Sequence, residues 1–344
     1  MDAEKSTARR GTSELEKPTL AKPTMSELKS EIGQAIERLA SGRTDQLRRI
    51  ASPAYVLRAG VPEQQGGFDA LEHRFSTYRR AFPNLEIRVE DQLAEGQGVV
   101  TRVSMSGTQT GPLFIFPPSG KSFTMTAFHW MRLSNEKIVE HWLVEPRQGM
   151  LQQLGFLPPP EDEFIPPPPA PDEWHYGPTG SLEQNKALIV RLMEEAWDGG
   201  DISVCEEIVA EDAVDHNPFP GEPWGQEGIV WMLKELHRSL DYNERVADIV
   251  AEGEKVVVRR ELSLHHHDRY LGIPPTYRTA QMSIMAIFRI RENKIVERWG
   301  EMDILTLLVG LGVVPKAMLR GPLPLPVARI ATAIQQRQIR KVLH

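Results

Sequence analysis

The stretch KIVEHW at residues 137–142 recurs as KIVERW at residues 294–299, which is 157 positions further along the chain. At the same separation, AEGQGVV at 94–100 recurs as AEGEKVV at 251–257. One register therefore holds without insertions from about residue 94 to Pro158. A repeat with so long a period predicts two complete folded units, because solenoids are built from repeats of only a few tens of residues.

The duplication divides the 344 residues into two domains and three further segments. The first segment has few large apolar side chains, which predicts disorder. The segment between the domains is rich in proline, which fixes φ and lacks an N–H donor, so an extended linker is predicted. The predicted parts are a disordered N-terminal segment (1–24), a first domain (25–157), the linker (158–181), a second domain (182–315) and a C-terminal tail with a basic amphipathic helix (316–344).

Each copy begins with helical periodicity and continues with alternating strands. The second copy predicts helices around 188–197, 204–209 and 229–240 and strands at 245–250, 256–267, 280–289 and 294–302. The first copy predicts helices near 27–40 and 69–81 and strands near 86–93, 98–107, 122–133 and 137–144. Helices followed by consecutive strands predict the α+β class, in which a curved antiparallel sheet wraps over about three helices and encloses an apolar pocket.

Composition excludes several classes of function. The formal net charge of -7 gives no general attraction to a phosphate backbone or an anionic membrane, so no nucleic-acid partner is predicted and membrane binding is disfavoured. The single cysteine, Cys205, excludes an intrachain disulfide. The N-terminal residues do not form a signal peptide and no apolar run is long enough to span a bilayer, which predicts a cytoplasmic protein. No glycine-rich phosphate loop follows a strand, so no cofactor is predicted.

Several motifs in both copies resemble one family. The first copy has Phe82-Pro83-Asn84, Gly107-Thr108-Gln109-Thr110-Gly111 and Gln153-Leu154-Gly155, and the second has Gly272-Ile273-Pro274-Pro275-Thr276 and Asp303. With the repeated K-I-V-E-x-W strand, the combination resembles the SnoaL-like, polyketide cyclase-like branch of the NTF2-like superfamily. The resemblance implies two tandem cone-shaped domains. It also implies that the outer faces of the two sheets meet as an intramolecular pseudo-dimer, as single-domain relatives do.

The resemblance also implies candidate residues. The cyclases of the family close a ring by intramolecular aldol condensation, with an aspartate as acid/base and no metal. That aspartate corresponds to Asp303 in the second copy and to Pro146 in the first. The histidine of the G-T-H-x-G pattern corresponds to His266 and to Gln109. Since proline cannot transfer a proton and glutamine can only hydrogen-bond, the first copy is expected to be catalytically degenerate.

In the second copy, Asp303 would act as a base if apolar side chains desolvated it and raised its pKa. His266 or His216 would then hydrogen-bond the developing enolate. The residues expected to surround the substrate are Trp299, Trp231, Phe288 and Arg289.

Each candidate also has a structural interpretation. Asp303 can be the N-cap of a helix beginning at Ile304, and His216 can be a surface turn residue. His129, which aligns with Ala286, either compensates for the groups lost in the first copy or is a satisfied sheet histidine, and the second interpretation is favoured. His265 and His267 share one face of a strand while His266 lies on the other, so two histidines without a third ligand predict no metal site.

Two functions remain open from the sequence. The first is a cyclase or isomerase that acts on a hydrophobic, carbonyl-bearing, polyketide-like small molecule in the second copy. The second is a non-catalytic protein, in which the two domains bind a small molecule or form a scaffold, since the fold hosts many activities.

Overall fold

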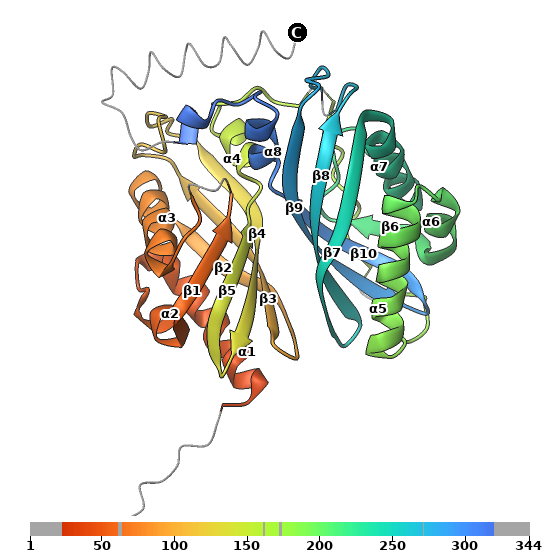
Figure 1. Ribbon diagram of the computed structural model, residues 1–344, viewed down its shortest axis with the longest axis horizontal. Helices are drawn as coiled ribbons and strands as arrows, with labels where there is room; N and C mark the ends of the chain where they lie inside the picture. The colour runs from red at the N-terminus through yellow and green to blue at the C-terminus, as the bar shows by residue number, and fades with distance from the viewer. Residues whose placement is uncertain (1–22, 61–63, 161, 172–173, 271, 320–344) are drawn as a thin grey trace, which may run out of the picture.

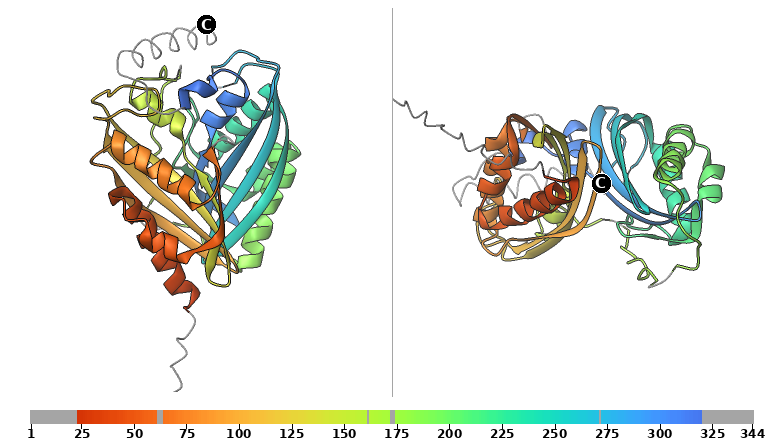
Figure 2. Two further views of the ribbon diagram at one scale, coloured as in Figure 1. Left: turned by 60° about the vertical axis from the view of Figure 1, so that its left-hand side comes forward. Right: turned by 90° about the horizontal axis from the view of Figure 1, so that it is seen from below.

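The computed structural model describes residues 23–60, 64–160, 162–171, 174–270 and 272–319. Two five-stranded sheets lie back to back, and the helices of each copy cover the sheet face that points away from the other copy (Figure 1). Each sheet curves around its own helices (Figure 2). The predicted α+β class and the duplication are therefore confirmed. The calls of disorder at 1–22 and of a basic helix beyond residue 319 lie outside the described residues.

Within the described residues, the elements of the first copy follow one another in chain order. They are α1 (Met25–Arg38), η1 (Leu39–Ser41), α2 (Asp45–Ile50), β1 (Ala51–Ala59), α3 (Phe68–Ala81), β2 (Glu86–Glu95), β3 (Gly98–Thr108), β4 (Ser122–Ser134), β5 (Lys137–Val144) and α4 (Arg147–Gln153). The strand order in the sheet is β1-β5-β4-β3-β2.

The second copy repeats this order. Its elements are α5 (Leu182–Arg191), the π-helical segment η3 (Leu192–Asp198), α6 (Ile202–Ile208), β6 (Val209–Asp215), α7 (Gly225–Ser239), β7 (Leu240–Glu252), β8 (Lys255–His266), β9 (Thr279–Arg291), β10 (Lys294–Met302), α8 (Ile304–Gly310) and η4 (Lys316–Leu319). Its sheet has the equivalent order β6-β10-β9-β8-β7.

The sequence did not predict the first strand of each sheet. β1 pairs with β5, and β6 pairs with β10, in parallel, so both sheets are mixed rather than wholly antiparallel. Each of these strands lies at the edge of its sheet and directly follows a short helix. The sequence of β6 could not be distinguished from the end of the preceding helix, because a short apolar run has no distinctive period.

Local signals repeat at the same separation as the motifs. Thr24 and Glu27 form a capping box at the start of α1, and Ser181 and Gln184 form one at the start of α5. A capping box satisfies two backbone donors of the first helical turn, so both helices begin at equivalent residues. The β4–β5 and β9–β10 turns each contain two successive residues with positive φ, which matches the type I′ hairpin turn.

Side chains from both sheets form one apolar cluster between them. Its members are Leu93, Val100, Phe128, Trp130, Trp142 and Val144 from the first copy and Val250, Val257, Met285, Ile287 and Trp299 from the second. These side chains alternate along their strands with residues that face the helices, so each sheet is buried on both faces.

Polar contacts at the edge of this cluster are reciprocal. Lys29 pairs with Glu252 at 2.6 Å, and the Ala94 N–H donates to the same carboxylate at 2.7 Å. The equivalent residues 157 positions along make the opposite pair: Lys186 pairs with Glu95 at 2.7 Å, and the Ala251 N–H donates to Glu95 at 2.8 Å.

The described part of the linker contacts the second copy. The Gly221 N–H donates to the Glu163 carbonyl at 3.0 Å, and the Tyr176 hydroxyl donates to Asp212 at 2.8 Å. Within the described residues, the chain has no helix with the length and apolar character that crossing a membrane requires.

Candidate functional site

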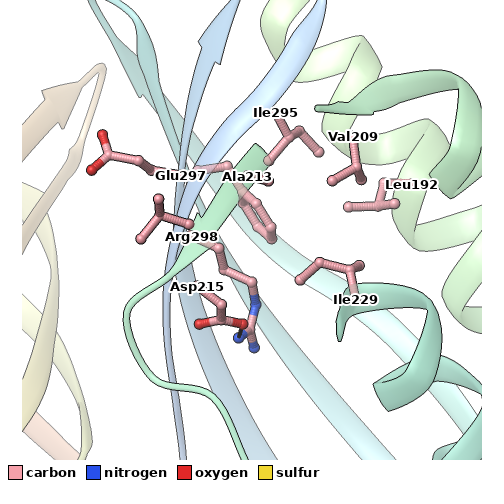
Figure 3. A pocket seen from close by; sticks show the side chains of 10 residues that line it. Leu192, Val209, Ala213, Asp215, Ile229, Ile295, Glu297 and Arg298 are labelled. Atoms are coloured by element: carbon pink, nitrogen blue, oxygen red, sulfur yellow. Dashed lines mark hydrogen bonds and ion pairs between the residues drawn. The ribbon is translucent and has the colours of Figure 1, made fainter. Parts of the chain in front are cut away.

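A buried ion pair joins two neighbouring strands in the interior of the second copy. Asp215 ends β6 and Arg298 lies on β10, and the Arg298 guanidinium donates to the Asp215 carboxylate. Both side chains lie beside a small cavity of about 10 Å³, which is the space of about one water molecule (Figure 3). The other lining residues are mostly apolar: Leu192, Val209, Ala213, Val214, Ile229, Phe288, Ile295 and Glu297. Low-polarity surroundings strengthen this ion pair.

Glu222 is a third charged group near this pair. It lies in the turn between β6 and α7 and is 1% exposed. Its Oε2 accepts from the Phe219 N–H at 2.9 Å, and its Oε1 has no hydrogen-bond partner among the described residues. Burial, together with the neighbouring Asp215, raises the pKa of Glu222 to about 8. The carboxyl is therefore largely protonated at neutral pH and can donate or accept a proton.

A larger cleft lies beside the same turn, whose Phe219 and Pro220 form part of its wall. Its volume is about 200 Å³. Aromatic and apolar side chains share its walls with four charged residues: Asp162, Phe219, Pro220, Trp231, Met232, Glu235, Arg238, Arg269, Tyr270 and Gly272. The walls come from α7, the β6–α7 turn, the β8–β9 loop and the linker. A cleft that combines aromatic walls with a few polar groups can hold a small molecule that also has polar groups.

The interior of the first copy contains a chain of three polar side chains. The Tyr55 hydroxyl lies 2.6 Å from Nδ1 of His141, and Nε2 of His141 lies 2.9 Å from Nδ1 of His129. Burial, with Arg74 nearby, lowers the pKa of His129 to about 3. Burial also lowers the pKa of His141 and raises that of Tyr55. All three groups are therefore neutral at physiological pH.

A second polar group lies next to this chain. Arg74 of α3 forms a buried ion pair with Glu145, which directly follows β5, and the Tyr78 hydroxyl donates to the same carboxylate at 3.2 Å. Burial raises the pKa of Tyr78, and the charge of Glu145 raises it further.

Comparison with known proteins places both copies in one family. The SnoaL-like polyketide cyclase family matches residues 31–154 and, a second time, residues 187–311. The chain belongs to the SnoaL-like polyketide cyclase family. The predicted tandem of SnoaL-like, NTF2-like domains is thereby confirmed.

Individual relatives match the length of one SnoaL-like domain. Nogalonic acid methyl ester cyclase of Streptomyces nogalater is 31% identical over 135 residues, which are 36% of this chain and 92% of that protein. The solved structure of IdmH, a proposed polyketide cyclase of Streptomyces antibioticus, is 33% identical with a TM-score of 0.34, and the match covers 38% of this chain and 99% of IdmH. AclR, a proposed hydroxylase of Streptomyces galilaeus, is 23% identical with a TM-score of 0.36, over 39% of this chain and 100% of AclR.

Asp303, the aspartate suggested by the SnoaL-like pattern, caps α8. Its carboxylate accepts from the Thr306 N–H at 3.2 Å and from the Thr306 hydroxyl at 2.6 Å. Arg147 of the first copy approaches the same carboxylate at 3.5 Å. Among the described residues, no hydrogen bond or ion pair joins Asp303 to His266 or His216. The structural interpretation of Asp303 as an N-cap is therefore realised in the fold.

His266 and Gln109 hold equivalent loops in the two SnoaL-like domains. Nδ1 of His266 accepts from the Thr276 N–H at 3.2 Å, and Oε1 of Gln109 accepts from the Ser119 N–H at 3.2 Å. The two donors are themselves 157 positions apart. Both side chains are fully buried, and burial lowers the pKa of His266. Glutamine and histidine thus fix the same turn with different acceptor atoms.

His216, Trp299 and Arg289 lie together on the face of the second sheet that points away from its own helices. The His216 ring stacks on Trp299 with centroids 4.5 Å apart, and its Nε2 lies 2.9 Å from Glu297. Arg289, which the sequence predicted to lie around the substrate, pairs with Glu297. Glu297 points away from Arg298 across β10 (Figure 3). The face that carries Trp299 therefore packs against the first copy.

The two remaining predicted residues line cavities. Trp231 lines the 200 Å³ cleft, and Phe288 lines the small cavity beside Arg298. The sequence did not single out Glu222 or the Asp215–Arg298 pair. Period-two alternation could have placed Arg298 on the face opposite Trp299, but Glu222 lies in the irregular turn FPGEPW, which has no periodic signal.

Proposed function

We propose that the second domain binds a hydrophobic, carbonyl-bearing small molecule of polyketide type in the cleft beside Trp231 and cyclises or isomerises it by metal-free acid/base chemistry. The observation that carries this proposal is the position of Glu222. It lies in the turn whose Phe219 and Pro220 form one wall of the cleft, and its pKa of about 8 suits proton transfer near neutral pH.

In this proposal Glu222 moves one proton in both directions. Its ionised form takes a proton from the carbon next to the substrate carbonyl, and the resulting enolate carbon attacks a second carbonyl of the same molecule. The protonated Glu222 then returns the proton to the alkoxide, so no proton is gained or lost overall. The positive charge of Arg298 favours the ionised form and Asp215 opposes it, which keeps both forms accessible.

The residues suggested by the family pattern have supporting positions in the same proposal. Asp303 and His266 fix the helix and the loop at the ends of β10 and β8, and His216 and Trp299 belong to the contact between the domains. The reciprocal contacts of Glu95 and Glu252 support a further part of the proposal, which is that the two domains form an intramolecular pseudo-dimer. In an isologous interface, each contact occurs twice with its partners exchanged.

The test is turnover of methyl esters of polyketide acids, because the S. nogalater relative is named for a methyl ester and the family for polyketides. Product formation is followed by liquid chromatography with mass spectrometry. Glu222→Gln is expected to reduce kcat by about 100-fold or more, since a positioned acid/base group contributes roughly that factor. Trp231→Ala is expected to raise KM, because it removes a wall of the cleft.

Two variants are the controls. Glu227→Gln removes an exposed carboxylate from the same region and should leave kcat unchanged. Asp303→Asn keeps a capping oxygen and is also expected to retain turnover. Wild-type kcat in Glu222→Gln, or a loss confined to Asp303→Asn, would contradict the role of Glu222. If ligands bind in a Trp231-dependent way but no ester is converted, the second copy is a binding domain.

A further inference from the structure

One side chain of the first copy makes a hydrogen bond to the second copy that the second copy does not return. Thr126 lies on β4, and its hydroxyl donates to the carboxylate of Glu301 on β10. The residues at the equivalent positions, 157 residues away, are Ser283 and Val144. Since a valine side chain has no acceptor, Ser283 cannot make the equivalent bond. This contact is therefore one-sided, unlike the reciprocal pairs at the edge of the interface.

Arg147 makes a second one-sided contact. Its guanidinium lies 3.5 Å from the carboxylate of Asp303, which directly follows β10. The residues at the equivalent positions are Ile304 and Pro146, which cannot form an ion pair. Both one-sided contacts thus run from the first copy to the end of β10 in the second copy.

Glu301 also binds Asn217, which lies in the turn that follows β6. The Asn217 side-chain amide donates to Glu301 at 2.9 Å, and its oxygen accepts from the Gly300 N–H at 3.3 Å. Both ends of this amide are therefore held. By strand pairing, the counterpart of Asn217 in the first copy is Ala59, which has no polar side chain.

Asn217 holds the carboxylate of Asp215 in its place. The Asn217 backbone N–H donates to Oδ1 of Asp215 at 2.9 Å, while Oδ2 accepts from the Arg298 guanidinium. The side chains of Asp215 and Arg298 point towards each other (Figure 3). Asp215 is the charge that, together with burial, raises the pKa of Glu222. A continuous series of hydrogen bonds therefore runs from Thr126 to the carboxylate that acts on Glu222.

Charged groups from both copies face Glu301. Burial raises its pKa to about 8. The Thr126 hydroxyl opposes this rise, as do Arg298 and Arg102 of β3, whereas Asp215 adds to it. Two of these groups, Arg298 and Asp215, also act on the carboxyl proposed as the acid/base of the second copy. The contact between the copies and the proposed site thus share their charged neighbours.

We propose that Thr126 is a positioning residue, supplied by the first copy, for the acid/base site of the second copy. By holding Glu301 it fixes Asn217, and Asn217 fixes the Asp215 carboxylate beside Glu222. The site is therefore complete only when the first copy is docked on the second. This inference rests on the function proposed for Glu222. It gives the first copy a task that requires no acid/base group of its own.

The test measures the pKa of Glu222 without any substrate. The full chain is labelled with ¹³C at the glutamate carboxyls, and spectra are recorded at a series of pH values on both sides of 8. The Glu222 signal is the one that is missing in Glu222→Gln. Thr126→Val keeps the shape of the side chain and removes the hydroxyl, so Asp215 should be held less closely beside Glu222. The pKa of Glu222 should then fall below its wild-type value.

Kinetics give a second measurement of the same change. Thr126→Val should lower kcat by about tenfold, since small displacements in an active site reduce rates steeply. KM should stay nearly the same, because the walls of the cleft are not altered. The pH at which kcat is half-maximal should fall together with the pKa of Glu222.

Two variants are matched controls. Ser283→Ala removes the hydroxyl at the equivalent position of the second copy, which faces the position of Val144 by the same symmetry, and should change neither the titration nor kcat. Thr126→Ser keeps the hydroxyl and should restore the wild-type titration.

Asn217→Ala breaks a later step of the same series. It should lower the pKa of Glu222 in the same direction as Thr126→Val. The double variant should shift this pKa no further than Asn217→Ala alone, because both side chains act through one path. A merely structural role would lower stability in each variant and leave the titration of Glu222 unchanged. If Thr126→Val does not fold, Asn217→Ala decides.

Two results would overturn the proposal. One is a wild-type titration of Glu222 in folded Thr126→Val and Asn217→Ala, and the other is a shift in Ser283→Ala as large as that in Thr126→Val. Circular dichroism and thermal unfolding establish that each variant is folded. The proposed function fails separately: if the wild-type chain converts no ester, the titrations still decide whether Thr126 positions Asp215.

Discussion

The interiors of the two copies differ, although their sheets have the same strand order. Where the first copy has His141 the second has Arg298, and where the first has His129 the second has Ala286. At these positions the first copy therefore has a neutral hydrogen-bond chain, whereas the second has an ion pair with a protonated carboxyl beside it. The shared fold determines which positions face inward, and the side chains at those positions determine the chemistry.

The two sheet faces that meet between the copies are much more alike. Glu140 pairs with Arg132 and Arg58 in the first copy, and Glu297 pairs with Arg289 and His216 in the second. Trp142 and Trp299 both lie in the apolar cluster between the sheets. Since each of these faces must fit the other, contact between the copies restricts these positions, whereas the interiors are free to diverge.

The largest expected effect breaks the ion pair between Asp215 and Arg298. Asp215→Asn is made together with Glu222→Gln, so that Glu222 cannot replace the lost charge. Relative to Glu222→Gln alone, we expect the free energy of unfolding to fall by about 3–5 kcal/mol, because Arg298 is left buried and unpaired. Denaturant unfolding measures this change.

The matched variant in the first copy is His141→Phe, which removes a neutral group at the position of Arg298. The expected loss is about 1–3 kcal/mol, the cost of leaving neutral hydrogen-bonding groups without partners. Equal losses from the two changes would show that the positions of His141 and Arg298 do not differ in charge as described.

The second expected effect depends on pH. Glu301 is buried between the copies, where it accepts from Asn217 at 2.9 Å and from Thr126 of the first copy, and its counterpart is Val144. Burial raises its pKa to about 8. Because the pKa of Glu301 is higher in the folded protein, its contribution to stability is present below about pH 4.5 and is lost as the pH rises through about 8.

Glu301→Gln should therefore have little effect near pH 5 and should stabilise the protein above pH 8 by on the order of 2 kcal/mol. Thermal unfolding at a series of pH values measures the difference. Glu222→Gln removes the other carboxyl whose pKa is about 8 and should shift the profile in the same direction. A difference between Glu301→Gln and wild type that does not change with pH would contradict the raised pKa.

The smallest expected effect tests the reciprocal contacts. Glu95→Gln and Glu252→Gln each remove one of two equivalent ion pairs at the edge of the interface. Each should lower the free energy of unfolding by less than about 1 kcal/mol, because both pairs are partly exposed. The two losses should be equal within error, and should shrink in high salt. Clearly unequal losses would mean that the two contacts are not equivalent in solution.

The sequence predicted the architecture better than the site. The repeated motifs gave the duplication, and the strand at 294–302 has the predicted bounds. A period of two puts Glu297 and Trp299 on one face of the strand, but it does not tell whether that face lines the interior of the domain; here it meets the other copy. Cavities depend on how side chains pack, so the cleft beside Trp231 and the raised pKa of Glu222 have no signal in a single sequence.

The paired contacts of Glu95 and Glu252 have a consequence for how this chain behaves at low concentration. When two subunits are separate molecules, dilution pulls them apart and every substitution appears in both. Here a linker joins the partners, so each copy experiences the other at a fixed effective concentration, of the order of millimolar for short flexible connections. Association therefore does not depend on how much protein is present, and one copy can change its interior while the other keeps its own.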